Sequence, residues 1–163
     1  MMDQNTLLSL LWQFLLAGTA TICFGLTFGV PRREYWACGL VGGVGWAVYT
    51  LMLWNGHGSA LATLVASIPL AALARAFAIW HKAPVTLFLI SGIFPLVPGA
   101  GIYYTAYYFI MGDPRFGGKG METLRIALAL ALGMTIVLGL PLPLHYQTRQ
   151  NGTGKPARTK EKP

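Results

Sequence analysis

The most constraining feature of this sequence is an apolar and aromatic stretch, residues 85–111, that is interrupted at its centre. An unbroken helix of about 27 residues would be roughly 40 Å long, whereas the hydrocarbon core of a bilayer is about 30 Å thick. Residues 95–101 read Pro-Leu-Val-Pro-Gly-Ala-Gly. The prolines remove backbone donors, and the glycines favour backbone conformations that helices do not use. The sequence therefore predicts two half-helices joined by non-helical backbone at membrane depth.

This predicted break indicates a transporter. Non-helical backbone survives inside a bilayer only where protein or a water-filled cavity surrounds it. Many transporters form their substrate sites at such interrupted helices. The alternative is a packed helix that its prolines merely kink. Two prolines and two glycines within seven residues are more than a kink requires.

The composition also indicates a membrane protein. Hydrophobic residues make up 55% of the chain and charged residues only 10%, whereas soluble domains carry about 25% charged residues. Much of the net charge of +7 lies in the last 19 residues, which contain few apolar side chains. We expect residues 1–144 to form one transmembrane helical domain and residues 145–163 a disordered basic cytoplasmic tail. Such a tail suits anionic lipid headgroups, and no nucleic-acid partner is expected.

Hydropathy and helix-breaking residues predict an all-α membrane protein with five transmembrane helices, the fourth broken at residues 95–101. With the N-terminus outside, nine of the 12 Lys and Arg residues fall on the cytoplasmic side. The positive-inside rule therefore predicts an outside N-terminus and a cytoplasmic C-terminus. A re-entrant fourth segment is the alternative, and it would move the basic tail outside. The predicted spans are residues 7–30, 35–54, 59–80, 85–111 and 122–142.

The break also supplies candidate substrate-binding residues. A half-helix starting near Gly99 would direct unpaired N–H groups and its positive dipole end towards the membrane centre, which suits a carboxylate. The hydroxyls of Tyr103 and Tyr104 would follow at helical spacing. An outer aromatic belt is the alternative for these tyrosines and is favoured for Tyr107 and Tyr108. At the break itself the candidates are Pro95, Pro98, Gly99, Ala100 and Gly101.

Charged residues inside the predicted spans are scarce. Arg75 lies well inside the third span, where a charge is costly and by default functional, although its long side chain could instead reach the interface. No Asp or Glu lies at the middle of a span, and His57, His81 and His145 fall in loops or the tail, where we expect solvated side chains. Proton relays usually need an acid or histidine within the membrane. We therefore expect the coupling acids on a partner.

Glycine spacing predicts close helix packing, and nothing in the sequence indicates an enzyme. Small residues four apart let helix backbones approach. No metal or cofactor is expected, because the two cysteines have no partner at metal-ligand spacing. The spans offer no paired carboxylates and no Ser/His/Asp set. The glycine pairs are Gly25 with Gly29 and Gly39 with Gly43.

Two stretches of this sequence resemble the threonine/serine exporter (ThrE) family. They are Phe-Gly-Val-Pro-Arg-Arg at residues 28–33, and Ile-Phe-Pro-Leu-Val-Pro-Gly at residues 93–99, followed by Tyr103. The resemblance covers about residues 7–142. It is closest to the small five-helix subunit that corresponds to the C-terminal half of the full-length exporters.

The resemblance implies a secondary exporter, driven by the proton motive force, in the bacterial inner membrane. It implies substrates that carry a carboxylate, either threonine and serine or dicarboxylates such as succinate. It also implies a partner, a separate membrane subunit resembling the N-terminal half of the exporter, and a homo-oligomer stays open. The alternative function is a non-transporting helical scaffold or assembly subunit of another membrane complex.

Overall fold

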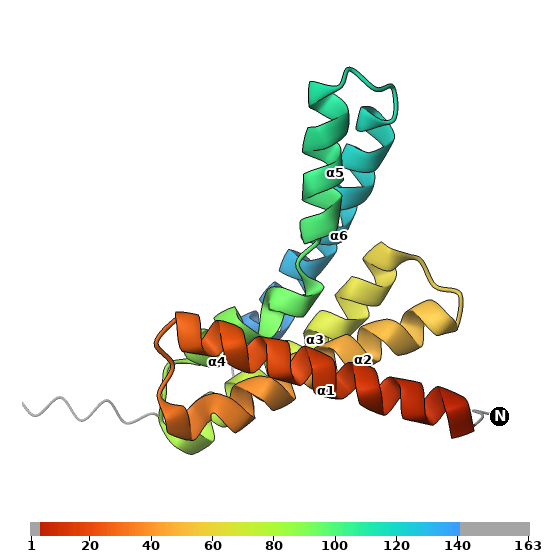
Figure 1. The fold of residues 1–163 in the computed structure, drawn as a ribbon. Coiled ribbons are helices and arrows are strands. Elements are labelled where there is room, and N and C mark those ends of the chain that lie inside the picture. Colours follow the sequence, from red (N-terminus) through yellow and green to blue (C-terminus); the bar gives the residue numbers. More distant parts are fainter. Residues whose placement is uncertain (1–3, 141–163) are drawn as a thin grey trace, which may run out of the picture.

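The computed structural model describes residues 4–140, with side chains from residue 7 onwards, and this part of the chain is helical apart from its turns (Figure 1). Four helices are long and apolar enough to cross a membrane, or five if the bent pair α4–η2 and α5 counts as one span. The prediction of an all-α membrane protein is therefore confirmed. The predicted basic tail lies outside the described residues. In chain order the elements are α1 (Gln4–Thr27), η1 (Arg32–Glu34), α2 (Tyr35–Trp54), α3 (Ser59–His81), α4 (Val85–Ile93), η2 (Phe94–Leu96), α5 (Gly99–Ile110) and α6 (Phe116–Gly139).

The body of the molecule is built from closely packed helices. Helix α2 packs between α1 and α3, the short α4 lies against α2 and α3, and α6 lies along α3. Small residues make these contacts close, because a Cβ added at Gly42 would overlap the Thr21 side chain and one added at Gly43 would come within 2.8 Å of Phe14. Small side chains at helix contacts allow this packing in a membrane, where no hydrophobic effect drives helices together.

The first glycine pair has a different role from the one predicted. Helix α1 ends in a Schellman motif, in which the Val30 N–H donates to the Gly25 carbonyl (3.0 Å) and the Gly29 N–H to the Leu26 carbonyl (3.2 Å). Gly29 adopts a φ of +69°, which favours glycine. The Gly25 and Gly29 pair therefore ends a helix, whereas Gly39 does pack: its Cβ would lie 3.3 Å from the Gly18 carbonyl oxygen.

Helix α6 begins at Phe116, six residues before the predicted start of the last span. The Asp113 carboxylate accepts the Arg115 N–H at 2.8 Å and closes the turn before the helix. Gly120 in the first turns then packs against α5, where an added Cβ would lie 3.3 Å from Thr105. Tertiary contacts thus outweigh the low helix propensity of this glycine.

Helix α5 and the N-terminal part of α6 project from the body as a two-helix arm (Figure 1). Helix α5 packs mainly against α6, and none of its side chains is buried. A cover from outside this chain, either lipid or protein, would be needed to remove the apolar residues of the arm from water.

Candidate functional site

The fourth segment is broken, as the sequence predicts. The axes of its two halves, Val85–Leu96 and Gly99–Ile110, differ by 55°. After α4 the chain tightens into η2, and the Val97 N–H donates to the carbonyls of Ile93 (3.1 Å) and Phe94 (3.3 Å). Pro98 then has φ −75° and ψ 56°, and the Gly99 N–H donates back to the Val97 carbonyl at 2.7 Å. This is an inverse γ-turn, so the main chain between the two half-helices is not helical.

The break leaves backbone donors free at the start of α5. The Ile102 N–H is bonded to the Pro98 carbonyl at 3.0 Å, but the N–H groups of Ala100 and Gly101 have no backbone acceptor within residues 4–140. Gly99 and Ala100 are exposed. A Cβ at Gly99 would meet nothing within 4 Å. Within the described residues, the N-terminus of α5 therefore presents free donors on an open surface.

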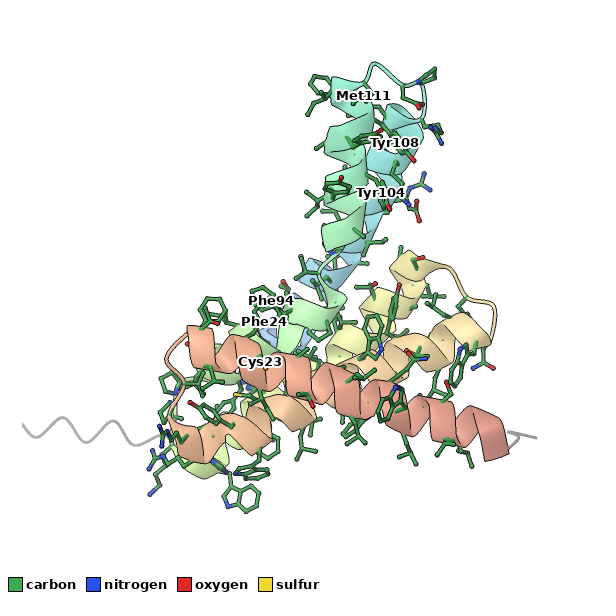
Figure 2. All side chains as sticks on the ribbon, in the orientation of Figure 1. Cys23, Phe24, Phe94, Tyr104, Tyr108 and Met111 are labelled. Carbon is green, nitrogen blue, oxygen red and sulfur yellow. The ribbon has the colours of Figure 1, made fainter. Side chains whose placement is uncertain are left out.

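Helix α1 holds the break in place through aromatic contacts. The rings of Phe24 and Phe94 are stacked, with centroids 3.9 Å apart and planes at 11°. Phe28 adds a tilted contact to Phe94 at 5.6 Å. Figure 2 shows Phe24 and Phe94 meeting where α1 passes the break, with Tyr104 and Tyr108 farther along α5.

A groove of about 390 Å³ runs between α1, α2 and the break. It is apolar except for the Gln13 amide, whose Oε1 accepts hydrogen bonds from Trp46 Nε1 and Thr50 Oγ1, both at 3.1 Å. Because an indole N–H can only donate, these bonds fix the amide oxygen on the Trp46 side. The amide nitrogen has no hydrogen-bond acceptor in the described part of the chain. The groove is lined by Gln13, Leu16, Ala17, Ala20, Phe24, Trp46 and Pro95.

The structure does not bring all of the predicted site residues together. Pro95 lines the groove, and Pro98 to Gly101 form the break beside it, but Tyr103 (63% exposed) and Tyr104 lie on the outer surface of the arm. Tyr104 instead stacks on Tyr108, with centroids 6.2 Å apart. The two rings line a second groove of about 450 Å³ with Arg115, Gly118 and Lys119. The charges there are paired with neighbouring acids, Arg115 with Asp113 and Lys119 with Glu122.

Arg75 forms hydrogen bonds with the C-terminal end of α6. Its Nη1 donates to the carbonyl oxygens of Val137 at 2.7 Å and Leu138 at 3.3 Å, at the C-terminus of α6. These carbonyls have no partner within the helix, and a positive charge there also complements the helix dipole. The half-buried Arg75 thus joins α3 to α6, and no hydrogen bond within residues 4–140 links it to the break.

Comparison with known proteins identifies the family of this chain. The sequence model of the family described as "Threonine/Serine exporter, ThrE" matches residues 13–139, which contain the groove and both half-helices. The chain belongs to the threonine/serine exporter family. It is therefore a multi-pass membrane protein of a transporter family and not an enzyme.

One relative is much longer than the part of it that this chain matches. A protein of Mycobacterium tuberculosis (strain ATCC 25618 / H37Rv) named "Probable threonine/serine exporter" is 31% identical over 102 residues. The match covers 63% of this chain and 19% of the relative, so the chain corresponds to about a fifth of the relative's length. No solved structure matches this member of the family.

The sequence reasoning missed the polar residue in the groove. Gln13 is a polar amide inside the first apolar segment, and this contrast with its neighbours could have identified it. Its partners, Trp46 and Thr50, lie 33 and 37 residues away on α2, so the pattern of α1 alone does not reveal them.

The expectation of a solvated His81 is wrong. Its side chain is 17% exposed, and Nδ1 contacts the carboxylate of Glu34, whose side chain is 2% exposed. Glu34 also receives the Arg33 Nε at 2.9 Å. The buried acid and histidine come from turns 47 residues apart, and no local pattern marks such a pair in advance. Of the two cysteines, Cys23 is exposed on α1 and Cys38 is buried.

Proposed function

We propose that this chain is the five-span subunit of a secondary exporter of small carboxylate-bearing metabolites, either threonine and serine or dicarboxylates such as succinate. The observation that carries the proposal is the pair of free N–H groups, on Ala100 and Gly101, at the start of α5, where the fourth segment bends by 55°. Such a helix start favours a carboxylate through its unpaired donors and its dipole. Membership of an exporter family supports the same function.

The groove beside the break suits a small metabolite. Its volume of about 390 Å³ lies within the range of about 300–1,000 Å³ found for small-molecule sites. The Gln13 amide nitrogen would donate to a second polar group of the substrate, while Trp46 and Thr50 hold the amide in place. Gln13 therefore provides the polar side chain of the proposed site. Arg75, Tyr103 and Tyr104, which the sequence suggested for this role, lie elsewhere in the structure.

The open side of the break indicates a protein partner. Exposed non-helical backbone is tolerated at membrane depth only when protein or a water-filled cavity surrounds it, and this chain leaves Gly99 and Ala100 uncovered. We propose that a separate membrane subunit, resembling the N-terminal half of the exporter, covers them. The chain would then cross the bacterial inner membrane five times, with the N-terminus outside, and use the proton motive force. A second copy of this chain is the alternative cover.

The double substitution Pro98→Ala with Gly99→Leu tests the substrate site. It fills the start of α5 where Gly99 has free space, and we expect at least a tenfold loss of export per copy of the protein that co-purifies with the partner. The matched control is Gly117→Leu, at the start of α6, where an added Cβ also meets nothing within 4 Å. Both properties should be measured in cells that lack the chromosomal copy of this chain.

Three results would contradict parts of the proposal. Normal export by the double variant would show that the break does not bind substrate, and it would favour the alternative of a non-transporting scaffold. A loss of export that only matches the loss of co-purification would assign the break to the partner interface and not to the substrate site. Export of amino acids or dicarboxylates by this chain alone in liposomes would refute the need for a partner.

A further inference from the structure

Glu34 is a buried carboxylate at the end of the bundle where α2 begins and α3 ends. It is 1% exposed, while the other two acids of the described part of the chain, Asp113 and Glu122, are not buried. Its Oε2 contacts Nδ1 of His81, and its Oε1 receives Nε of Arg33 at 2.9 Å. The candidate span that contains α2 starts at Arg32, so this pair lies at the membrane boundary. Burying an ionisable group there costs free energy unless hydrogen-bonded partners stabilise it, and such a group often has a function.

Aromatic rings from α2, α3 and α4 enclose the imidazole of His81. The ring centroids of Trp36 and Trp80 lie 5.4 Å and 5.5 Å away, and those of Phe77 and Phe88 lie 5.9 Å and 6.0 Å away. These rings leave the His81 side chain 17% exposed, so solvent still reaches it. Lys82, the next residue, has a left-handed backbone with φ 52°, which turns the chain sharply away after the histidine.

The charged and titratable groups around the pair are few. On its own turn Glu34 has Arg33, 77% exposed, and the exposed Arg32; on α2 the buried Cys38 lies close enough to interact with the charge of Glu34. On α3 the group is His81, followed by the exposed Lys82, and α4 carries no titratable side chain. Because Arg33 Nε donates to Oε1 at 2.9 Å, Oε2 is left to accept the Nδ1 proton of His81.

We propose that Glu34 and His81 form a proton-binding site. A proton from water adds to the lone pair on Nε2 of His81, and the resulting imidazolium stays paired with the Glu34 carboxylate through Nδ1. Release of the Nε2 proton to water restores the neutral ring. Histidine is suited to this exchange, since its charge changes between about pH 5 and 8 in ordinary surroundings.

Glu34 and His81 lie where the ends of three helices meet. Glu34 lies on the turn that joins α1 to α2, and His81 is the last residue of α3, so a change of charge acts on three helices at once. The use of this proton in transport rests on the proposed function. There, protonation would set the strength of the contact between the α1–α2 turn and the end of α3, and thereby couple the pH on this side of the membrane to export.

Nitrogen-15 NMR of histidine-labelled protein in lipid nanodiscs tests the site directly. At pH 8 we expect His81 as the Nδ1–H tautomer, which is the minor form of free histidine in water, and a change to the doubly protonated ring as the pH is lowered to 5. His81→Gln should remove these signals and assign them. Glu34→Gln should displace the change to lower pH, because the imidazolium loses its anionic partner. The control His57→Gln should leave the His81 signals unchanged, since His57 is exposed and contacts only the Met52 carbonyl.

Export measurements complete the test. In cells that also contain the partner, the pH dependence of export should be lost in His81→Gln and kept in His57→Gln. A His81 ring that stays neutral, or is found as the Nε2–H tautomer, would overturn the proton site without any variant having to fold. A His81 that titrates while His81→Gln keeps normal pH-dependent export would overturn its role in coupling. If the wild type exports none of the proposed substrates, the proposed function fails, and the NMR titration still decides whether the proton site exists.

Discussion

Phe24 on α1 and Phe94 at the start of η2 are stacked face to face, with centroids 3.9 Å apart. This contact ties the first helix to the break in the fourth segment, next to the groove that contains Gln13 and Pro95. A local interruption of one helix is thereby fixed against another helix. We therefore expect this contact to help set the orientation of the free N–H groups of α5.

Replacing Phe94 by alanine should loosen the break. Loss of the stacked pair and of the buried ring surface predicts a decrease of about 1–3 kcal/mol in the free energy of unfolding, measured by unfolding in mixed SDS micelles. Export should fall more than the amount of protein in the membrane does. The control Phe109→Ala removes a ring that is 67% exposed at the far end of α5. Equal effects of the two substitutions on export would show that Phe94 does not position the break.

The contact between α1 and α2 should not tolerate a side chain at Gly42. Its Cβ would overlap Thr21, whose hydroxyl is buried and donates to the Ala17 carbonyl at 2.8 Å. Gly42→Ala should therefore lower the free energy of unfolding by about 1–3 kcal/mol through overpacking. Gly58→Ala is the matched control, because a Cβ at Gly58 meets nothing within 4 Å and its φ of −68° suits any residue. A Gly42→Ala protein as stable as the wild type would mean that the two helices can separate at little cost.

Arg75 should contribute to stability rather than to substrate binding. Arg75→Leu removes the hydrogen bonds to the Val137 and Leu138 carbonyls, and we expect a loss of about 1–2 kcal/mol in the free energy of unfolding. Arg75→Lys keeps the charge at the helix end and should lose less. Export per assembled protein should stay near that of the wild type in both variants. A large change in the substrate KM would instead show that Arg75 takes part in substrate binding.

The turn between α5 and α6 should weaken in acid. Hydrogen bonds from the Arg115 side chain hold the pKa of Asp113 below its ordinary value. A lowered pKa in the folded state stabilises the fold above the ordinary pKa of about 3.9, and this stabilisation is lost as the pH falls through the lowered value. The Tm of Asp113→Asn should therefore be below that of the wild type at pH 7, and the difference should disappear in strong acid.

Two controls isolate this pair of charges. Arg115→Ala should lower the Tm at pH 7 in the same direction, and the double variant should lose less than the sum of the two single losses. Because the pair is exposed, 1 M salt should reduce the difference. A Tm difference that is constant from pH 7 to strong acid would show that the carboxylate charge plays no part.

Several elements could be predicted from local sequence. The second helix runs over Tyr35–Trp54 as predicted, because an uninterrupted apolar run lies between two polar turns. The break between α4 and α5 was predicted from its prolines and glycines, which act on their own backbone. The start of α6 was not, because it depends on the Asp113 turn and on the contact of Gly120 with Thr105 of α5.

The sequence by itself determined that this chain enters a membrane as apolar helices, and that one of them is interrupted, since hydropathy and backbone restrictions act locally. Only the tertiary structure decided which polar groups meet: Gln13 with Trp46 and Thr50, Glu34 with His81, and Arg75 with the end of α6. These contacts depend on how the helices cross and rotate about their axes. Close packing of side chains and small residues over the whole bundle sets those angles, and no short stretch of sequence contains them.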